Sequence, residues 1–121
     1  MHPLRVLVVD DNVPFASVLR RIIVGAGHAC AVVHSSDAAV AAVEMNTFDV
    51  VISDFHIGHQ SGIDLMRRVR QLEPRTRRIL MSGSAPSREE ADLSVVDRYL
   101  LKPFEREALL SALEGIAAPE S

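Results

Sequence analysis

Five short apolar segments recur along the chain, and each is followed by a stretch with helical periodicity. The first segment, Leu4–Val9, is apolar at nearly every position, as a strand buried on both faces of a sheet must be. The other segments are Ala29–Val33, Asp49–Ser53, Arg77–Ser82 and Asp97–Leu101. Parallel strands need long crossover connections, and helices usually supply them. The sequence therefore predicts an α/β domain with helices on both faces of a parallel sheet.

The intervening stretches carry apolar residues at helical spacing, between residues that favour helix ends. Pro14 suits the first turn of a helix that Gly25 can end. Ser36 or Asp37 can cap a second helix, and Pro74 stops a third. The helices expected from these signals cover about 14–25, 36–45, 62–72 and 104–117.

Two further segments give weaker signals. Residues 87–90 (Ser-Arg-Glu-Glu) have the spacing of a capping box, which predicts a short fourth helix with few apolar residues and brings the total to five. Residues 55–61 contain glycine and histidine without periodicity, so we expect a loop there.

Size and composition bound the class of protein. The 121 residues, 48% hydrophobic and 24% charged, suit one globular domain over 1–121, with 118–121 as a tail or the start of a linker. The net charge of −3 argues against direct nucleic-acid binding. Cys30 is the only cysteine, so no intrachain disulfide forms. No apolar run is long enough to span a membrane, and the first residues lack the pattern of a signal peptide. We expect a cytoplasmic protein.

Acidic side chains and a lysine lie directly after three of the predicted strands. Asp10 and Asp11 follow the first, Asp54 follows the third, and Lys102 follows the fifth. The carboxyl ends of parallel strands meet at one edge of a sheet, where ligands bind in open α/β folds. Carboxylates facing a lysine there suit a divalent cation and a phosphoryl group. A plainer alternative is that Asp10 and Asp11 cap the first helix and that Asp54 begins a turn.

From Leu4 to about Ile116 the chain resembles the receiver domains of response regulators, the CheY-like family. The resemblance rests on Val-Val-Asp-Asp-Asn at 8–12, Val-Ile-Ser-Asp at 51–54, Gly62, Ser82, and Tyr-Leu-Leu-Lys-Pro-Phe at 99–104. It implies a flavodoxin-like, doubly wound sheet with strand order 2-1-3-4-5 and five helices. The order comes from the resemblance, not from the spacing of the segments.

The resemblance also implies a metal-assisted phosphorylation site. Asp54 would be the phosphoacceptor. Mg²⁺ would be bound directly by Asp11, Asp54 and the backbone carbonyl of His56, and through water by Asp10. Lys102 would pair with Asp54 at rest and with a phosphoryl oxygen after transfer.

A second group of residues would respond to the phosphoryl group or tune its lifetime. By the same resemblance, the hydroxyl of Ser82 would donate to the phosphoryl group and Tyr99 would be the aromatic ring that changes its position. His56 and Ser84 flank the route of a hydrolytic water. The peptide bond between Lys102 and Pro103 would be cis.

The implied function is a phosphorylated switch rather than an enzyme with turnover. The phosphoryl group would come from a histidine kinase or a histidine phosphotransfer protein. It would change the surface of the fourth helix, fifth strand and last helix, which a downstream protein, a fused output domain or a second copy in a phosphorylation-dependent homodimer would bind. The alternatives are a pseudo-receiver that is never phosphorylated, a Mg²⁺-dependent aspartyl phosphohydrolase, and a flavodoxin-like nucleotide binder. The last of these needs a glycine- or hydroxyl-rich loop after the first strand, which residues 9–14 lack.

Some features depart from the family pattern or fall outside it. Gly58 stands where a proline is usual, which predicts a more mobile loop. His56 and His59 could bind a transition metal, but two loop histidines more often do not. The arginines at 67, 68, 70, 75, 77 and 78 could dock a partner; a solvated helix end is the simpler interpretation.

Overall fold

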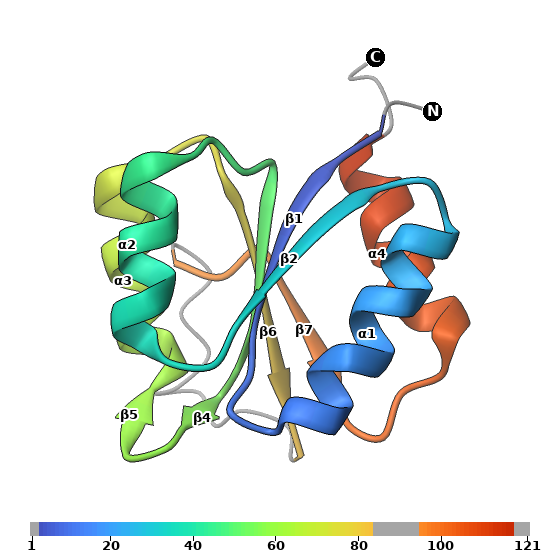
Figure 1. Ribbon diagram of the computed structural model, residues 1–121, viewed down its shortest axis with the longest axis horizontal. Helices are drawn as coiled ribbons and strands as arrows, with labels where there is room; N and C mark the ends of the chain where they lie inside the picture. Colours follow the sequence, from blue (N-terminus) through green and yellow to red (C-terminus); the bar gives the residue numbers. More distant parts are fainter. Residues whose placement is uncertain (1–2, 84–94, 118–121) are drawn as a thin grey trace.

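The computed structural model describes residues 3–83 and 95–117 and forms a five-stranded parallel sheet between helices (Figure 1). The strands of the sheet are β1 (Arg5–Val9), β2 (Ala29–Val33), β3 (Val50–Asp54), β6 (Arg77–Ser82) and β7 (Arg98–Leu101). The helices are α1 (Val13–Gly25), α2 (Ser36–Met45), α3 (Gly62–Leu72) and α4 (Arg106–Ala117). The strand order is β2-β1-β3-β6-β7, so the predicted order 2-1-3-4-5 is confirmed.

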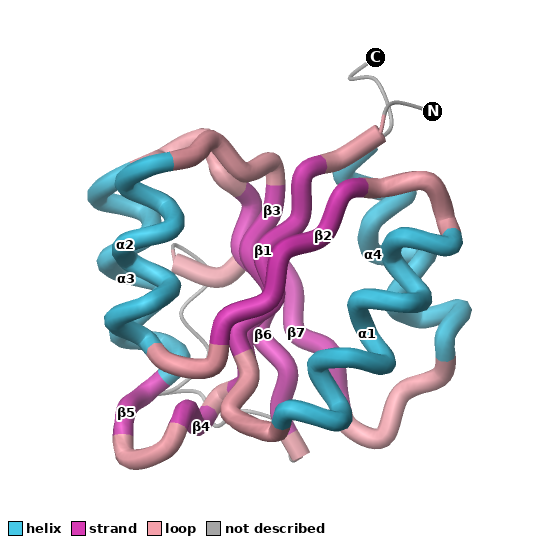
Figure 2. Tube along the Cα trace, viewed as in Figure 1, coloured by secondary structure: helices cyan, strands magenta, loops and turns pink. Residues whose placement is uncertain are grey.

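The helices cover the sheet in pairs, with α1 and α4 on one face and α2 and α3 on the other (Figures 1 and 2). The alternation of side chains along β1 explains the two layers. Val6 and Val8 belong to the core under α1 and α4, whereas Leu7 and Val9 belong to the core under α2 and α3. Each of these four side chains is almost fully buried, as the apolar run predicts.

Polar side chains set the beginnings of two helices. The Asn12 side chain caps α1 by accepting the backbone N–H of Phe15 at 3.1 Å. The alternative in which Asp10 or Asp11 caps this helix is therefore wrong, and their carboxylates are available for other contacts. Ser35, rather than Ser36 or Asp37, caps α2 by accepting the N–H of Ala38.

Residues 55–61 are more ordered than a loop. They contain a two-stranded antiparallel hairpin, β4 (His56–Ile57) and β5 (Gln60–Ser61), which turns at Gly58 with a φ of +61°. Such a backbone conformation suits glycine. The hairpin could not be predicted from the sequence, because its short strands lack the alternation of apolar and polar residues that marks longer hairpins. The predicted fourth helix from Ser87, and Ser84 itself, lie outside the described residues.

The last helix begins two residues later than predicted. Arg106 opens α4, while Phe104 lies before the helix with its ring edge-on to Phe15, the centroids 6.1 Å apart. In the described segments, no helix combines the length and apolar character needed to cross a bilayer.

Candidate functional site

Three carboxylates meet at the carboxyl edge of the sheet. β1 and β3 are paired in register, Val9 beside Ser53, so the residues that follow these strands emerge side by side. One oxygen each from Asp10, Asp11 and Asp54 lies within 4.8 Å of the others. Asp10 is fully buried, Asp54 is partly buried and Asp11 is exposed. Carboxylates this close repel each other unless a positive charge joins them.

Asp10 is the most deeply buried of the three, and one of its oxygens lacks a hydrogen-bond donor in the described part of the chain. Its Oδ1 accepts the N–H of Asn12 at 2.9 Å, but its buried Oδ2 has no hydrogen-bond donor among the described residues. Burial raises the pKa of this carboxyl, while the hydrogen bond from Asn12 and the charge of Lys102 act in the opposite direction. A buried acceptor without a donor is the position at which a cation or a cation-bound water fits.

Lys102 supplies the positive charge at this edge. Its Nζ lies 3.4 Å from Oδ1 of Asp54 and 3.6 Å from Oδ2 of Asp10. The backbone N–H of Lys102 donates to the carbonyl of Ser82 at 2.7 Å, which holds the end of β7 beside the end of β6. The peptide bond between Lys102 and Pro103 is cis. The structure therefore brings together the side chains that the sequence grouped by their positions after strands.

Two glycines shape the backbone around Asp11 and Asp54. The N–H of Gly58 donates to Oδ2 of Asp11 at 2.9 Å, a bond that a proline could not make. The sequence predicts only a more mobile loop at Gly58 and gives no signal for this contact. At Gly62 a Cβ would collide with the backbone carbonyl of Asp54, so only glycine lets α3 begin this close to β3.

The other predicted residues differ in burial. Ser82 ends β6 and is buried, and Tyr99 is partly buried on β7 against the core under α2 and α3. His56 is exposed on β4, its ring packed edge-on against Phe55 with centroids 4.8 Å apart.

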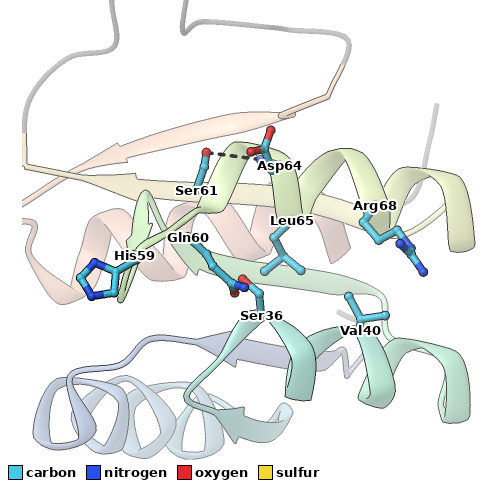
Figure 3. A pocket seen from close by; sticks show the side chains of 8 residues that line it. All are labelled: Ser36, Val40, His59, Gln60, Ser61, Asp64, Leu65 and Arg68. Carbon is cyan, nitrogen blue, oxygen red and sulfur yellow. Dashed lines mark hydrogen bonds between the residues drawn. The ribbon is translucent and has the colours of Figure 1, made fainter.

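His59 does not belong to the acidic cluster. Figure 3 shows it on the hairpin beside Gln60, where both line a hollow of about 450 Å³ between α2 and α3. In residues 3–83 and 95–117, the only group of three or more ligating side chains close enough for a metal is the set of three aspartates. The histidine pair therefore gains no third ligand in the described part of the chain.

Two polar residues were missed or misinterpreted from the sequence. His34 follows β2, and its Nδ1 lies 2.9 Å from the backbone carbonyl oxygen of Asp10, which accepts a hydrogen bond from the ring. Arg78, taken as part of a solvated basic run, is only 7% exposed. Its guanidinium donates to the carbonyls of Val95, Thr76 and Pro74, and burial lowers its pKa. The run's other members, Arg67, Arg68, Arg70, Arg75 and Arg77, are exposed.

Comparison with curated proteins gives relatives in bacterial signalling. The chain is 30% identical to the transcriptional regulatory protein ZraR of Salmonella typhimurium, over 93% of this chain and 26% of that protein. It is 36% identical to the virulence sensor protein BvgS of Bordetella bronchiseptica, over 95% of this chain and 10% of that protein. The chain thus spans about a quarter of the first relative and a tenth of the second.

Solved structures share the fold over nearly all of the chain. A CheY-like receiver domain protein from Methanospirillum hungatei superposes with a TM-score of 0.88 at 22% identity, covering 96% of this chain and 95% of that one. A response regulator from Burkholderia pseudomallei, solved with a phosphorylated aspartic acid, a calcium ion and citrate, gives a TM-score of 0.81 at 29% identity. That match covers 96% of this chain and 75% of the other.

The family comparison agrees with the geometry of the site. The sequence model described as "Response regulator receiver domain" matches residues 6–114, which run from β1 into α4 and include all three aspartates and Lys102. The chain therefore belongs to the response regulator receiver domains, the phosphoacceptor modules of two-component signalling systems.

Proposed function

We propose that Asp54 accepts the phosphoryl group, from a phosphohistidine of a histidine kinase or of a histidine phosphotransfer protein. The observation that carries this proposal is the convergence at one sheet edge of three carboxylates and one ammonium group, with Lys102 Nζ 3.4 Å from Asp54 Oδ1. Asp54 is partly buried, so its carboxylate is held by the fold yet still accessible to a donor. The neighbour with a phosphorylated aspartic acid supports the same chemistry.

In the transfer step, an Asp54 side-chain oxygen attacks phosphorus. The bond from phosphorus to the donor histidine nitrogen breaks, and the donor ring, which carries a proton on its other nitrogen, leaves with the electron pair. The product is an acyl phosphate on Asp54 and a neutral imidazole on the donor. Such transfers depend on positioning and on stabilisation of charge at the phosphoryl oxygens, which this site offers through Lys102 and a cation.

The acidic cluster fits a hard divalent cation, and we assign Mg²⁺. Asp11, Asp54 and the backbone carbonyl of His56 would bind it directly, and Asp10 through water. The orphaned Oδ2 of Asp10 supports this arrangement, because a metal-bound water would supply the donor that this oxygen lacks. When bound, the ion neutralises charge on the phosphoryl oxygens.

After transfer, Lys102 and Ser82 would hold the phosphoryl oxygens. Phosphorylation adds a charge of about −1.5 to −2, enough to attract the Ser82 hydroxyl and the Lys102 ammonium. Tyr99 lies on β7, the strand that ends directly before Lys102. Its ring would then change position and alter the surface of β7, α4 and the segment before β7. A downstream protein, a fused output domain or a second copy of the chain would bind that surface.

Intact mass measurement tests the proposal. We expect one phosphoryl group to be gained by the wild-type protein with acetyl phosphate and Mg²⁺, and none by Asp54→Asn. Asp64→Asn is the matched control, because Asp64 is exposed on α3 and pairs with Arg67 away from the site. No gain in the wild type would favour the pseudo-receiver, and an equal gain in Asp54→Asn would move the acceptor to another residue.

A further inference from the structure

An aromatic ring underlies the ammonium group of Lys102. Lys102 Nζ lies 4.4 Å from the centroid of the Phe15 ring, while the same nitrogen faces the carboxylates of Asp54 and Asp10. The lysine side chain is 25% exposed, so its ammonium is partly withdrawn from water. An ammonium over an aromatic face is attracted by the ring's quadrupole, and partial desolvation strengthens that attraction.

The ring is held in place from two sides. The Asn12 cap accepts the N–H of Phe15, which fixes the first turn of α1 directly after Asp10 and Asp11. Phe104, two residues beyond Lys102, packs its ring edge-on against Phe15 at an interplanar angle of 69°. The two phenylalanines thus join the segment after β1 to the segment after β7, and the lysine lies between that aromatic pair and the acids.

We propose that Phe15 is a positioning residue for phosphoryl transfer, acting through Lys102. The proposal rests on the proposed function, since it gives Phe15 a role in presenting the ammonium to the Asp54 phosphoryl group. A lysine stem has several rotatable bonds, and two carboxylates, at 3.4 and 3.6 Å, compete for its ammonium. The ring face adds a weakly directional attraction that retains the ammonium near Asp54 while it exchanges a carboxylate for a phosphoryl oxygen.

The chain offers a single-site probe of this contact, because Lys102 is its only lysine. Protein labelled with ¹³C-lysine gives one set of side-chain resonances, and the protons on Cε are shielded when they lie over a ring. We expect these protons to resonate upfield in the wild type and to move toward the free-lysine position in Phe15→Leu. Phe15→Tyr keeps an aromatic face, and we expect its Cε protons to stay upfield.

The second measurement is the rate of phosphorylation by acetyl phosphate with Mg²⁺. We expect Phe15→Leu to react roughly two- to fivefold more slowly, the effect of losing one cation–π contact, and Phe15→Tyr to keep the wild-type rate. Phe48→Leu is the matched control. Phe48 also lies under a cation, Arg5, whose guanidinium carbon is 5.9 Å from its ring, but it precedes β3 at the opposite edge of the sheet.

The outcomes separate this proposal from the one on which it rests. Unchanged Cε resonances in Phe15→Leu, an unchanged rate, or an equal loss in Phe48→Leu would each overturn the role of Phe15. A wild-type protein that takes no phosphoryl group would instead overturn the proposed function. The resonance measurement needs no phosphorylation and would still decide whether Phe15 holds the ammonium.

Discussion

Among the described residues, each edge of the sheet buries one charged side chain, Asp10 at the carboxyl edge and Arg78 at the amino edge. Arg78 donates to backbone carbonyls at three residues and lies 3.9 Å from Asp97. Asp10 keeps one buried oxygen without a donor in the described residues. Burial disfavours the charged form of both side chains. The guanidinium of Arg78, however, forms most of its possible hydrogen bonds within the chain, whereas the carboxylate of Asp10 does not. A buried charged group whose hydrogen bonds are made within the chain is typical of a structural role, whereas one that lacks a hydrogen-bond partner is typical of a ligand site.

The largest expected effect is at Arg78. Replacing it in Arg78→Met keeps most of the volume but leaves buried carbonyls, including that of Val95, without their donors. We expect the free energy of unfolding to fall by about 3 kcal/mol, as when one partner of a buried charged network is removed. Urea denaturation measures the loss. Arg77→Ala on the exposed side of the same strand should change stability by less than about 0.5 kcal/mol. Equal losses would show that Arg78 contributes no more than a surface charge.

Within the acidic edge, Gly58 stabilises the position of Asp11 through its backbone N–H. Gly58→Pro removes the N–H that Asp11 accepts and imposes a negative φ where the chain has +61°. We expect a loss of about 2 kcal/mol in the free energy of unfolding. Gly58→Asn is the control, since asparagine tolerates this backbone region and keeps the N–H, and it should lose less than half as much. A Gly58→Pro protein as stable as the wild type would mean that the hairpin does not hold Asp11.

The contrast between these predictions shows what could be learned from the sequence. The sheet order followed from resemblance, and the position of the acids followed from apolar runs that end directly before Asp10 and Asp54. The position of the acids depends only on neighbours along the chain. The burial of Arg78 depends on partners brought by the fold: Val51 beside it on β3, and Asp97 nineteen residues later accepting its backbone N–H. Nothing local distinguishes Arg78 from Arg77.

Two contacts at the candidate site could not be predicted from the sequence, because they also join distant segments. The contact between Phe15 and Lys102 joins the first turn of α1 to the end of β7, and no periodicity in either segment predicts it. The hydrogen bond from Gly58 to Asp11 spans 47 positions and depends on a backbone angle that only the folded hairpin fixes. The charged groups of the site could therefore be predicted from the sequence, but the residues that position them could not.

Neutralising Asp10 should have the opposite sign to neutralising Arg78. Without divalent cations, Asp10→Asn removes a buried charge that lacks full compensation, and we expect a gain of about 1 kcal/mol in the free energy of unfolding at neutral pH. Saturating Mg²⁺ should reverse the order, because the wild type binds the ion more tightly and gains more by mass action. Chemical denaturation with EDTA or with Mg²⁺ measures both arms. A destabilised Asp10→Asn in EDTA would place Asp10 with Arg78 as a structural charge.

The smallest effect, and the most specific, is the pH dependence of that gain. The folded-state pKa of Asp10 is raised, so the unfolded chain loses this proton at lower pH than the folded protein does. Below about pH 3.8 Asp10 is protonated in both states and does not lower the free energy of unfolding. As pH rises through the folded-state pKa, the buried carboxylate forms and stability is lost. In EDTA, the stability difference between Asp10→Asn and the wild type should be smallest near pH 3 and grow over this window. It should level off at about 1 kcal/mol toward neutral pH. Titrating groups that do not interact with Asp10 cancel in the difference. A constant difference across the range would mean that Asp10 is as well compensated as Arg78.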